Sequence, residues 1–194
     1  MSNQNLLVKN LVKSIHAKKL FIDDVVQQLI FEQVISLVIT CYKSGGRLYI
    51  AGNGGSAADA QHLAAEFVSK LARDRSPLPA EALTVDSSIL TAIGNDYGYD
   101  QVFARQIEGK CTKSDIFLAI TTSGNSPNIL KALVKCKEIG VSSILFAGKD
   151  GGAAKELADY TIIAPGESTA IIQEVHLVME HTLCESVENA IFNN

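Results

Sequence analysis

The strongest constraint on the fold is a repeated order along the chain: a short apolar run, a turn rich in glycine or serine, and a helical stretch. Five runs have the length and composition of strands, at 47–51, 81–85, 116–121, 143–147 and 160–164. Helical patterns lie between them, at 57–71, 87–93, 100–109, 127–139 and 153–157. Strands that alternate with crossover helices form parallel sheets. The sequence therefore predicts an α/β fold with a mostly parallel, doubly wound sheet.

Helices are also expected at both ends of the chain. Apolar residues recur at helical spacing from Leu6 to Tyr42, which predicts two helices broken near Asp23. The stretch 168–191 starts with Ser and Thr and contains no proline or glycine, so it predicts one long helix. No linker or repeat interrupts the chain. We expect a single domain over 1–194, with 1–44 as an N-terminal helical extension packed on it.

The composition is that of a soluble globular protein. The chain has 194 residues, of which 47% are hydrophobic and 20% charged, enough to bury a core without metals or disulfides. Its 17 basic and 21 acidic residues give a net charge of −4 without a basic patch, which predicts no nucleic-acid partner. No apolar run approaches membrane-spanning length and no basic, apolar leader opens the chain, so we expect a cytoplasmic protein without a membrane partner.

The four cysteines are scattered, with no CxxC pair. This is the usage expected of reduced thiols in a cytosolic fold. We interpret all four as packing residues, namely Cys41, Cys111, Cys136 and Cys184.

The first candidate motif is the glycine-rich stretch 51–56, which follows the first strand and opens a helix. Gly52, Gly54 and Gly55 let backbone amides approach a ligand, and the helix start offers unpaired N–H groups. The motif is neither the GxGxxG of dinucleotide folds nor a P-loop. It predicts a site for an anion or a sugar hydroxyl, and a tight strand-to-helix turn is the structural alternative.

The second candidate motif is the hydroxyl-rich stretch 121–127, again between a strand and a helix. It offers four hydroxyls and a glycine, with Ser126 as the N-cap and Pro127 at the first helical position. Hydroxyls, amides and one helix end can hold a phosphate without lysine. The alternative is a capped helix start whose serines have no ligand.

Two helices carry groups suited to proton transfer or metal binding. Asp59, His62 and Glu66 lie along one face of the helix that opens at Ser56. His62 and Glu66 can share a divalent metal, or a partly buried Glu66 can act as a general base. A solvated surface pair is the alternative.

The final helix adds Gln173 and His181, which are eight residues apart and can face one cleft, whereas His176 points elsewhere. For a single histidine, a hydrogen-bonded structural role is the alternative. The four residues that together suit zinc by their nitrogen and oxygen donors are His62, Glu66, Gln173 and His181.

As a set, these motifs resemble the phosphoheptose isomerases, which are sugar isomerase (SIS) domain proteins. The resemblance also rests on Ile93–Gly98, Gly148–Gly152 and Ile172–His176, and it extends from the first helices to the C-terminus. It implies a three-layer α/β/α sandwich, assembled as a homotetramer with shared active sites. Members convert sedoheptulose 7-phosphate to D-glycero-D-manno-heptose 7-phosphate, the entry to the heptose of lipopolysaccharide cores.

The resemblance also implies roles for individual residues. Glu66 matches the base of the enediol step, and His181 matches its acid and base partner at oxygen. Zinc, where members carry it, is held by residues that match His62, Glu66, Gln173 and His181. The substrate site that we predict contains Asn53, Gly54, Ser56, Asp96, Thr121, Thr122, Ser123, Asn125, Ser126 and Gln173.

The sequence departs from the family pattern at three positions. Ile171 and Lys70 stand where members usually have arginine, and Thr121 replaces a serine but keeps its hydroxyl. Two other readings belong to different functional classes. One is a non-catalytic SIS protein that binds the replication initiator, and the other is a module that senses a sugar phosphate. Neither needs the pair of Glu66 and His181.

Overall fold

The computed structural model describes residues 3–192, so the outermost two residues at each end of the predicted domain lie outside the described part. The helices are α1 (Asn3–Asp23), α2 (Val25–Lys43), α3 (Gly55–Val68), α4 (Ser87–Tyr97), α5 (Ala104–Lys110), α6 (Pro127–Ile139) and α7 (Thr169–Phe192). Two short 3-10 turns are η1 (Tyr99–Gln101) and η2 (Ala153–Glu156). The strands are β1 (Leu48–Gly52), β2 (Ala80–Ala82), β3 (Ile116–Thr121), β4 (Ser142–Gly148) and β5 (Tyr160–Ala164).

The five strands form one parallel sheet in the order β2-β1-β3-β4-β5, which confirms the predicted doubly wound sheet. The prediction was wrong for 153–157, where η2 is a single 3-10 turn between β4 and β5 and not an α-helix. The stretch 100–109 likewise starts as η1 before α5 begins at Ala104. Gly151 and Gly152 directly precede η2 and take positive φ, so helical geometry does not extend back from Ala153, and β5 begins soon after, at Tyr160.

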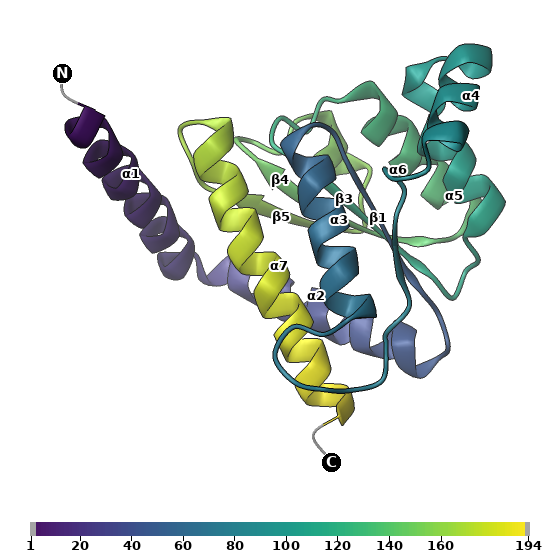
Figure 1. The fold of residues 1–194 in the computed structure, drawn as a ribbon, viewed down its shortest axis with the longest axis horizontal. Helices are drawn as coiled ribbons and strands as arrows, with labels where there is room; N and C mark the ends of the chain where they lie inside the picture. Colours follow the sequence, from purple (N-terminus) through teal and green to yellow (C-terminus); the bar gives the residue numbers. More distant parts are fainter. Residues whose placement is uncertain (1–2, 193–194) are drawn as a thin grey trace.

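Helices cover both faces of the sheet and produce three layers (Figure 1). Alternate residues of each strand face opposite layers. In β3, Leu118 packs with the core of α2, α3 and α7, whereas Phe117 packs with the core of α5 and α6. All six β3 residues are buried, as expected for a central strand between two helical layers.

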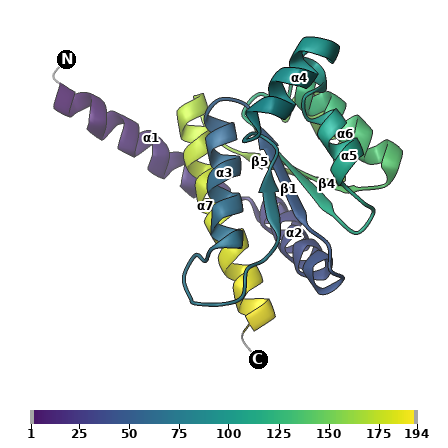
Figure 2. The same cartoon turned by 45° about the vertical axis from the view of Figure 1, so that its right-hand side comes forward.

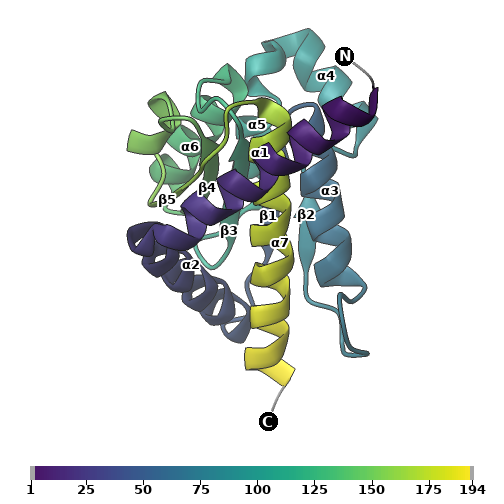
Figure 3. The same ribbon diagram turned by 90° about the vertical axis from the view of Figure 1, so that its left-hand side faces the viewer.

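The two N-terminal helices are separated at Asp24, next to the predicted break. The Asp24 side chain accepts a hydrogen bond from the backbone N–H of Gln27 and so caps α2. Helix α1 projects from the body of the molecule and crosses α7 (Figures 2 and 3). Large apolar side chains of α1 remain more than half exposed, including Leu7, Val12 and Ile15.

Among residues 3–192, α2 is the one helix that is long and apolar enough to cross a membrane by length and composition alone. The same test is passed by helices of soluble domains. Helix α2 buries Phe31, Val34, Val38 and Cys41 and packs against β5 and α7. It therefore forms part of the helical layer in this structure.

The cysteines are free thiols, as predicted. Cys41, Cys136 and Cys184 are buried, and Cys111 is half-buried. Burial raises the pKa of the Cys184 thiol to about 12, with the Glu188 charge adding to the effect. A thiol with such a pKa is protonated at neutral pH and is a poor nucleophile, so Cys184 acts as a packing residue.

Candidate functional site

Two predicted ligand loops meet at the point where the sheet changes direction. β1 and β3 are neighbours, and the chain leaves β1 towards β2 but leaves β3 towards β4. Ligands of open parallel sheets bind in the crevice at the carboxyl ends of such strands. The glycine-rich stretch 51–56 follows β1, and the hydroxyl-rich stretch 121–127 follows β3. Both predicted loops thus reach the position that the fold favours for a ligand.

The first loop has the backbone of a tight approach to α3. Gly54 takes a φ of +58° as the N-cap of α3 and leaves the first amides of the helix without a capping side chain. A Cβ on Gly52 would lie 2.4 Å from the carbonyl oxygen of Ser56, so only glycine fits there. Ser56 itself is buried in the first turn of α3. The stretch 51–56 is therefore a tight strand-to-helix turn, and this turn also leaves the start of α3 without a capping side chain, as a ligand site requires.

The second loop keeps one hydroxyl free of the helix it precedes. Ser126 is the N-cap of α6 and Pro127 follows it, as predicted, but the Ser126 side chain makes no capping hydrogen bond. Ser123 Oγ accepts from the N–H of Asn125 at 3.2 Å, and Thr121 Oγ1 accepts from the N–H of Gly124 at 3.3 Å. Thr122 is half-buried between these residues. Hydrogen bonds within the loop hold its backbone, and the Ser126 hydroxyl is available for a ligand.

Asn125 joins this loop to the turn that follows β4. Its Oδ1 accepts a hydrogen bond from the N–H of Ala153 at 3.0 Å. Gly124 takes a φ of +66° beside this junction, and a Cβ there would lie 1.9 Å from the carbonyl oxygen of Gly151. The predicted substrate residue Asn125 therefore also has a clear structural role.

Asn53 forms a polar link across the two loops that the sequence did not reveal. Asn53 and Asn128 exchange two amide hydrogen bonds, of 2.9 and 2.8 Å, and Tyr99 Oη donates to Asn53 Oδ1 at 3.3 Å. Asn128, in the first turn of α6, is 2% exposed. The sequence shows only an asparagine directly after Pro127, and its partner Asn53 lies 75 residues away in the chain.

Helices α3 and α7 bring the predicted acid and base groups together. His62 Nε2 and His181 Nε2 lie 2.9 Å apart, and His62 Nε2 lies 3.6 Å from Glu66 Oε1. For a hydrogen bond between the two rings, one Nε2 must be protonated and donate while the other accepts. The His62 and Glu66 side chains are 43% and 20% exposed, so both are accessible to a ligand. His62 and Glu66 are thus more than a solvated pair, because His181 from a distant part of the chain joins them.

Two predicted residues lie away from this cluster. The Gln173 amide packs against Gly55 at the start of α3, where a Cβ on Gly55 would lie 2.2 Å from Gln173 Nε2. Gly55 precedes His62 by seven residues, or about 10 Å of helix axis. Asp96 is exposed near the end of α4, where its carboxylate accepts a hydrogen bond from Asn95. Neither residue contacts His181 through a hydrogen bond or ion pair in the described chain.

The donor types at the α3–α7 contact suit zinc, but one chain does not assemble the whole predicted set. Imidazole nitrogen and carboxylate oxygen are ordinary zinc ligands, and His62, Glu66 and His181 contribute them here. Across residues 3–192, however, no group of three or more His, Cys, Asp or Glu side chains is arranged to hold a metal ion. The contacts of His62 with Glu66 and His181 are pairwise, and the Gln173 amide lies elsewhere.

Behind the cluster, α7 buries further polar groups against the sheet and α3. His176 Nε2 lies 3.0 Å from the carbonyl oxygen of Ala147, and burial lowers the pKa of His176 to about 4. This confirms that His176 points away from the candidate site. Burial, with the Asp59 charge adding to it, raises the pKa of Glu180 to about 8, and both Glu180 carboxyl oxygens lack a hydrogen-bond partner among the described residues. Burial also raises the pKa of Asp59.

The two departures from arginine have different surroundings. Ile171 is 5% exposed and belongs to the core between the sheet and α7. Lys70 is 52% exposed and pairs with Asp74 at 3.7 Å in the loop after α3. A charge is therefore retained only at position 70, at an exposed place.

The comparisons with known proteins agree with this architecture. The SIS domain family model matches residues 19–148. The chain is 49% identical over 181 residues to the phosphoheptose isomerase of Aneurinibacillus thermoaerophilus, which covers 93% of this chain and 91% of the relative. The chain belongs to the phosphoheptose isomerase family. The phosphoheptose isomerase of Clostridium acetobutylicum is 46% identical over 191 residues, 97% of this chain and 96% of the relative.

Phosphoheptose isomerases of known structure share the fold along almost the whole chain. The structure from Neisseria gonorrhoeae superposes with a TM-score of 0.90 at 36% identity, covering 97% of this chain and 100% of that chain. The structure from Francisella tularensis gives a TM-score of 0.92 at 33% identity, with the same coverage. The predicted three-layer SIS fold with a long C-terminal helix is confirmed.

Proposed function

We propose that this chain is an aldose-ketose isomerase that converts sedoheptulose 7-phosphate to D-glycero-D-manno-heptose 7-phosphate, the first step towards the activated heptose of lipopolysaccharide cores. The observation that carries the proposal is the convergence of His62, Glu66 and His181, from two helices, in a chain that also has two ligand loops at the sheet edge. Membership of the phosphoheptose isomerase family supports the same reaction.

Isomerisation requires one base at carbon and one acid-base partner at oxygen. In our proposal, the Glu66 carboxylate removes a proton from C1 of the ketose and returns it to C2 of the enediol. His181 moves the proton between the oxygens of C1 and C2. Because the two groups come from different helices, they can act on adjacent atoms of one substrate. The initiator-binding and sensing alternatives would leave this cluster without a use.

Phosphate binding is assigned to the two loops at the carboxyl ends of β1 and β3. No side chain caps the start of α3 after Gly54, so the positive end of its helix dipole faces this loop, and the Ser126 hydroxyl makes no capping hydrogen bond to α6. In a heptose 7-phosphate, the phosphate and the reacting carbons lie at opposite ends of the sugar. A phosphate subsite separate from the acid-base cluster is therefore required, and an acidic protein can supply it from helix ends and hydroxyls.

We also propose that the active protein binds one zinc ion per subunit through His62, Glu66, Gln173 and His181. The imidazole, amide and carboxylate donors support this set. When bound, zinc would polarise the oxygens of the reacting carbons. Ligation would reduce the freedom of Glu66 as a base, so we propose that Glu66 alternates between holding the metal and transferring the proton.

We further propose that the enzyme is a homotetramer with shared active sites. The exposed apolar residues of α1, such as Leu7, Val12 and Ile15, support association with another copy. Within one chain, the Gln173 amide packs at Gly55, a backbone position about 10 Å along the α3 axis from His62. A neighbouring copy would supply the missing fourth ligand. We place the enzyme in the cytoplasm, where sugar phosphates are made.

Proton NMR with sedoheptulose 7-phosphate in deuterated water tests the proposed reaction. The expected product is an aldoheptose 7-phosphate with deuterium at C2, measured before and after chelation and zinc return. Glu66→Gln and His181→Ala should each lower kcat by at least about 100-fold while the fold and oligomer persist. Glu185→Gln, an exposed position on α7, is the matched control. A folded wild-type protein that forms no product under any metal condition would favour the sensing or initiator-binding reading.

A further inference from the structure

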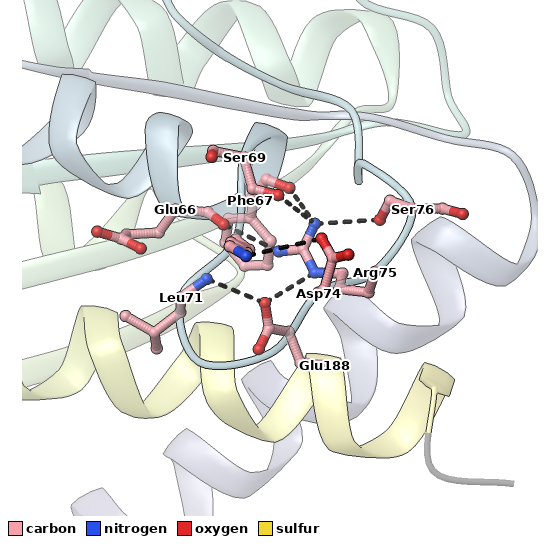
Figure 4. Close-up of polar contacts among 9 residues, drawn as sticks. Glu66, Phe67, Ser69, Leu71, Asp74, Arg75, Ser76 and Glu188 are labelled. Carbon is pink, nitrogen blue, oxygen red and sulfur yellow. Dashed lines mark hydrogen bonds and ion pairs between the residues drawn. The ribbon is translucent and has the colours of Figure 1, made fainter.

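A buried ion pair ties the end of α3 to α7. Arg75 lies in the loop between α3 and β2, and Glu188 lies near the end of α7; each side chain is only 1% exposed. Arg75 Nε donates to Glu188 Oε1 at 2.7 Å, and the backbone N–H of Leu71 donates to the same oxygen at 3.1 Å. Figure 4 shows how Glu188 thereby holds both the loop and the arginine.

The same guanidinium holds the last turn of α3. Arg75 Nη2 donates to the carbonyl oxygen of Glu66 at 2.9 Å, and Nη1 donates to that of Phe67 at 2.6 Å (Figure 4). α3 ends at Val68, so both carbonyls belong to the turn that has no later N–H groups in the helix to bond. A cation at this end also interacts favourably with the helix dipole. Arg75 therefore replaces the missing continuation of α3 at the residue that carries the proposed base.

We propose that Arg75 is a positioning residue for the isomerase reaction. Its hydrogen bond to the Glu66 carbonyl fixes the turn that carries the base, and its pairing with Glu188 holds that turn against α7. His181 precedes Glu188 by seven residues, about two turns of the same helix. One guanidinium thus controls the relative placement of Glu66 and His181. The inference rests on the roles assigned to those two residues under the proposed function.

Placement matters because a shift of about 1 Å can lower a rate by about 100-fold. Arg75→Lys keeps the positive charge beside Glu188 but loses the planar fork, so one ammonium cannot reach Glu188 and both carbonyls in the same geometry. We expect kcat to fall by about 10- to 100-fold while KM stays within about threefold, since the phosphate loops lie at the opposite end of α3. Glu188→Gln, which removes the charge but keeps the shape, should have the same effect.

Asp74→Asn is the matched control, because Asp74 lies in the same loop with a side chain that is 97% exposed. It should leave kcat and KM unchanged. Hydrogen exchange by mass spectrometry gives a second readout. The amides of 66–69 should exchange about tenfold faster or more in Arg75→Lys than in the wild type, and their exchange rates in Asp74→Asn should equal those of the wild type. Circular dichroism establishes that each variant is folded, and Glu188→Gln provides the test if Arg75→Lys does not fold.

A folded Arg75→Lys protein with wild-type kcat, or one in which only KM changes, would overturn the proposal. The same holds if kcat falls while the exchange of 66–69 is unaltered, because the effect would then not act through the α3 turn. A wild-type protein without isomerase activity would instead refute the proposed function. In that case the exchange measurement still reports whether Arg75 fixes the turn.

Discussion

His176 provides a test of how α7 is packed against the sheet. Its ring is fully buried, and Nε2 lies 3.0 Å from the carbonyl oxygen of Ala147 in β4. Burial lowers the pKa of His176 from 6.5 to about 4. The folded state therefore disfavours the protonated ring, and this cost appears only as the pH falls below the unfolded pKa of 6.5. Stability should be intact above that pH and lost on acidification towards pH 4.

Each pKa unit corresponds to 1.36 kcal/mol, so the shift lowers the free energy of unfolding by about 3 kcal/mol once the pH is below 4. Between pH 7.5 and pH 5 the expected loss is about 2 kcal/mol. His176→Gln cannot titrate but keeps an N–H donor for the Ala147 carbonyl. Because the substitution also changes the absolute stability, the informative quantity is the change in the free energy of unfolding with pH.

Urea unfolding followed by circular dichroism at pH 5, 6 and 7.5, at fixed protein concentration and with a chelator present, measures this change. Wild type and His16→Gln, whose histidine is exposed on α1, should lose about 2 kcal/mol more than His176→Gln on acidification. The buried Glu180 contributes the opposite slope in all three proteins, so it cancels in the comparison. An equal loss in His176→Gln and wild type would refute the inference that His176 is buried in its neutral form.

Four further substitutions test the loops and the buried carboxyl group. Ser123→Ala and Ser126→Ala should each raise KM by about tenfold in steady-state assays with kcat within twofold, because a phosphate hydrogen bond acts in ground and transition states alike; a change confined to kcat would contradict this. Gly124→Ala should lower the unfolding free energy by more than about 2 kcal/mol in urea, since φ is +66° and the Cβ meets the Gly151 carbonyl; unchanged stability would show that the loop can relax. Because the raised pKa of Glu180 makes wild type lose stability as pH rises, the unfolding free energy of Glu180→Gln relative to wild type should increase by about 2 kcal/mol from pH 5 to pH 7. Glu185→Gln should show the same pH dependence as wild type. A difference in unfolding free energy between Glu180→Gln and wild type that does not change with pH would argue against a protonated Glu180.

Much of the fold could be predicted from local patterns. The bounds predicted for β3, β5 and α6 match the structure, because an apolar run between turn residues, or Pro127 before and Gly140 after a periodic stretch, carries its own signal. Local patterns also account for the one element type that is predicted wrongly, the helix over 153–157. Its composition suits a helix, but the segment lies between Gly151 and Gly152, which take positive φ, and β5, which begins at Tyr160, and it forms only one 3-10 turn.

The candidate site was predicted in part. The sequence placed both ligand loops after strands, and the helical period placed His62 and Glu66 on one face of α3. It did not reveal Asn128, which pairs with Asn53, or Arg75, which lies in an aperiodic loop. It also predicted that Gln173 and His181 face one cleft, and the structure packs both against α3, Gln173 at Gly55 and His181 at His62.

Local sequence signals therefore specify the order of strands and helices and the chemistry available at each loop, because propensity, periodicity and capping act over a few residues. Long-range packing selects which of these groups come into contact. His62 and His181 are 119 residues apart, and Arg75 and Glu188 are 113 apart. Such contacts follow from the strand order β2-β1-β3-β4-β5 and from the packing of α3 against α7. That packing results from burying apolar surface across the whole domain, which no local pattern encodes.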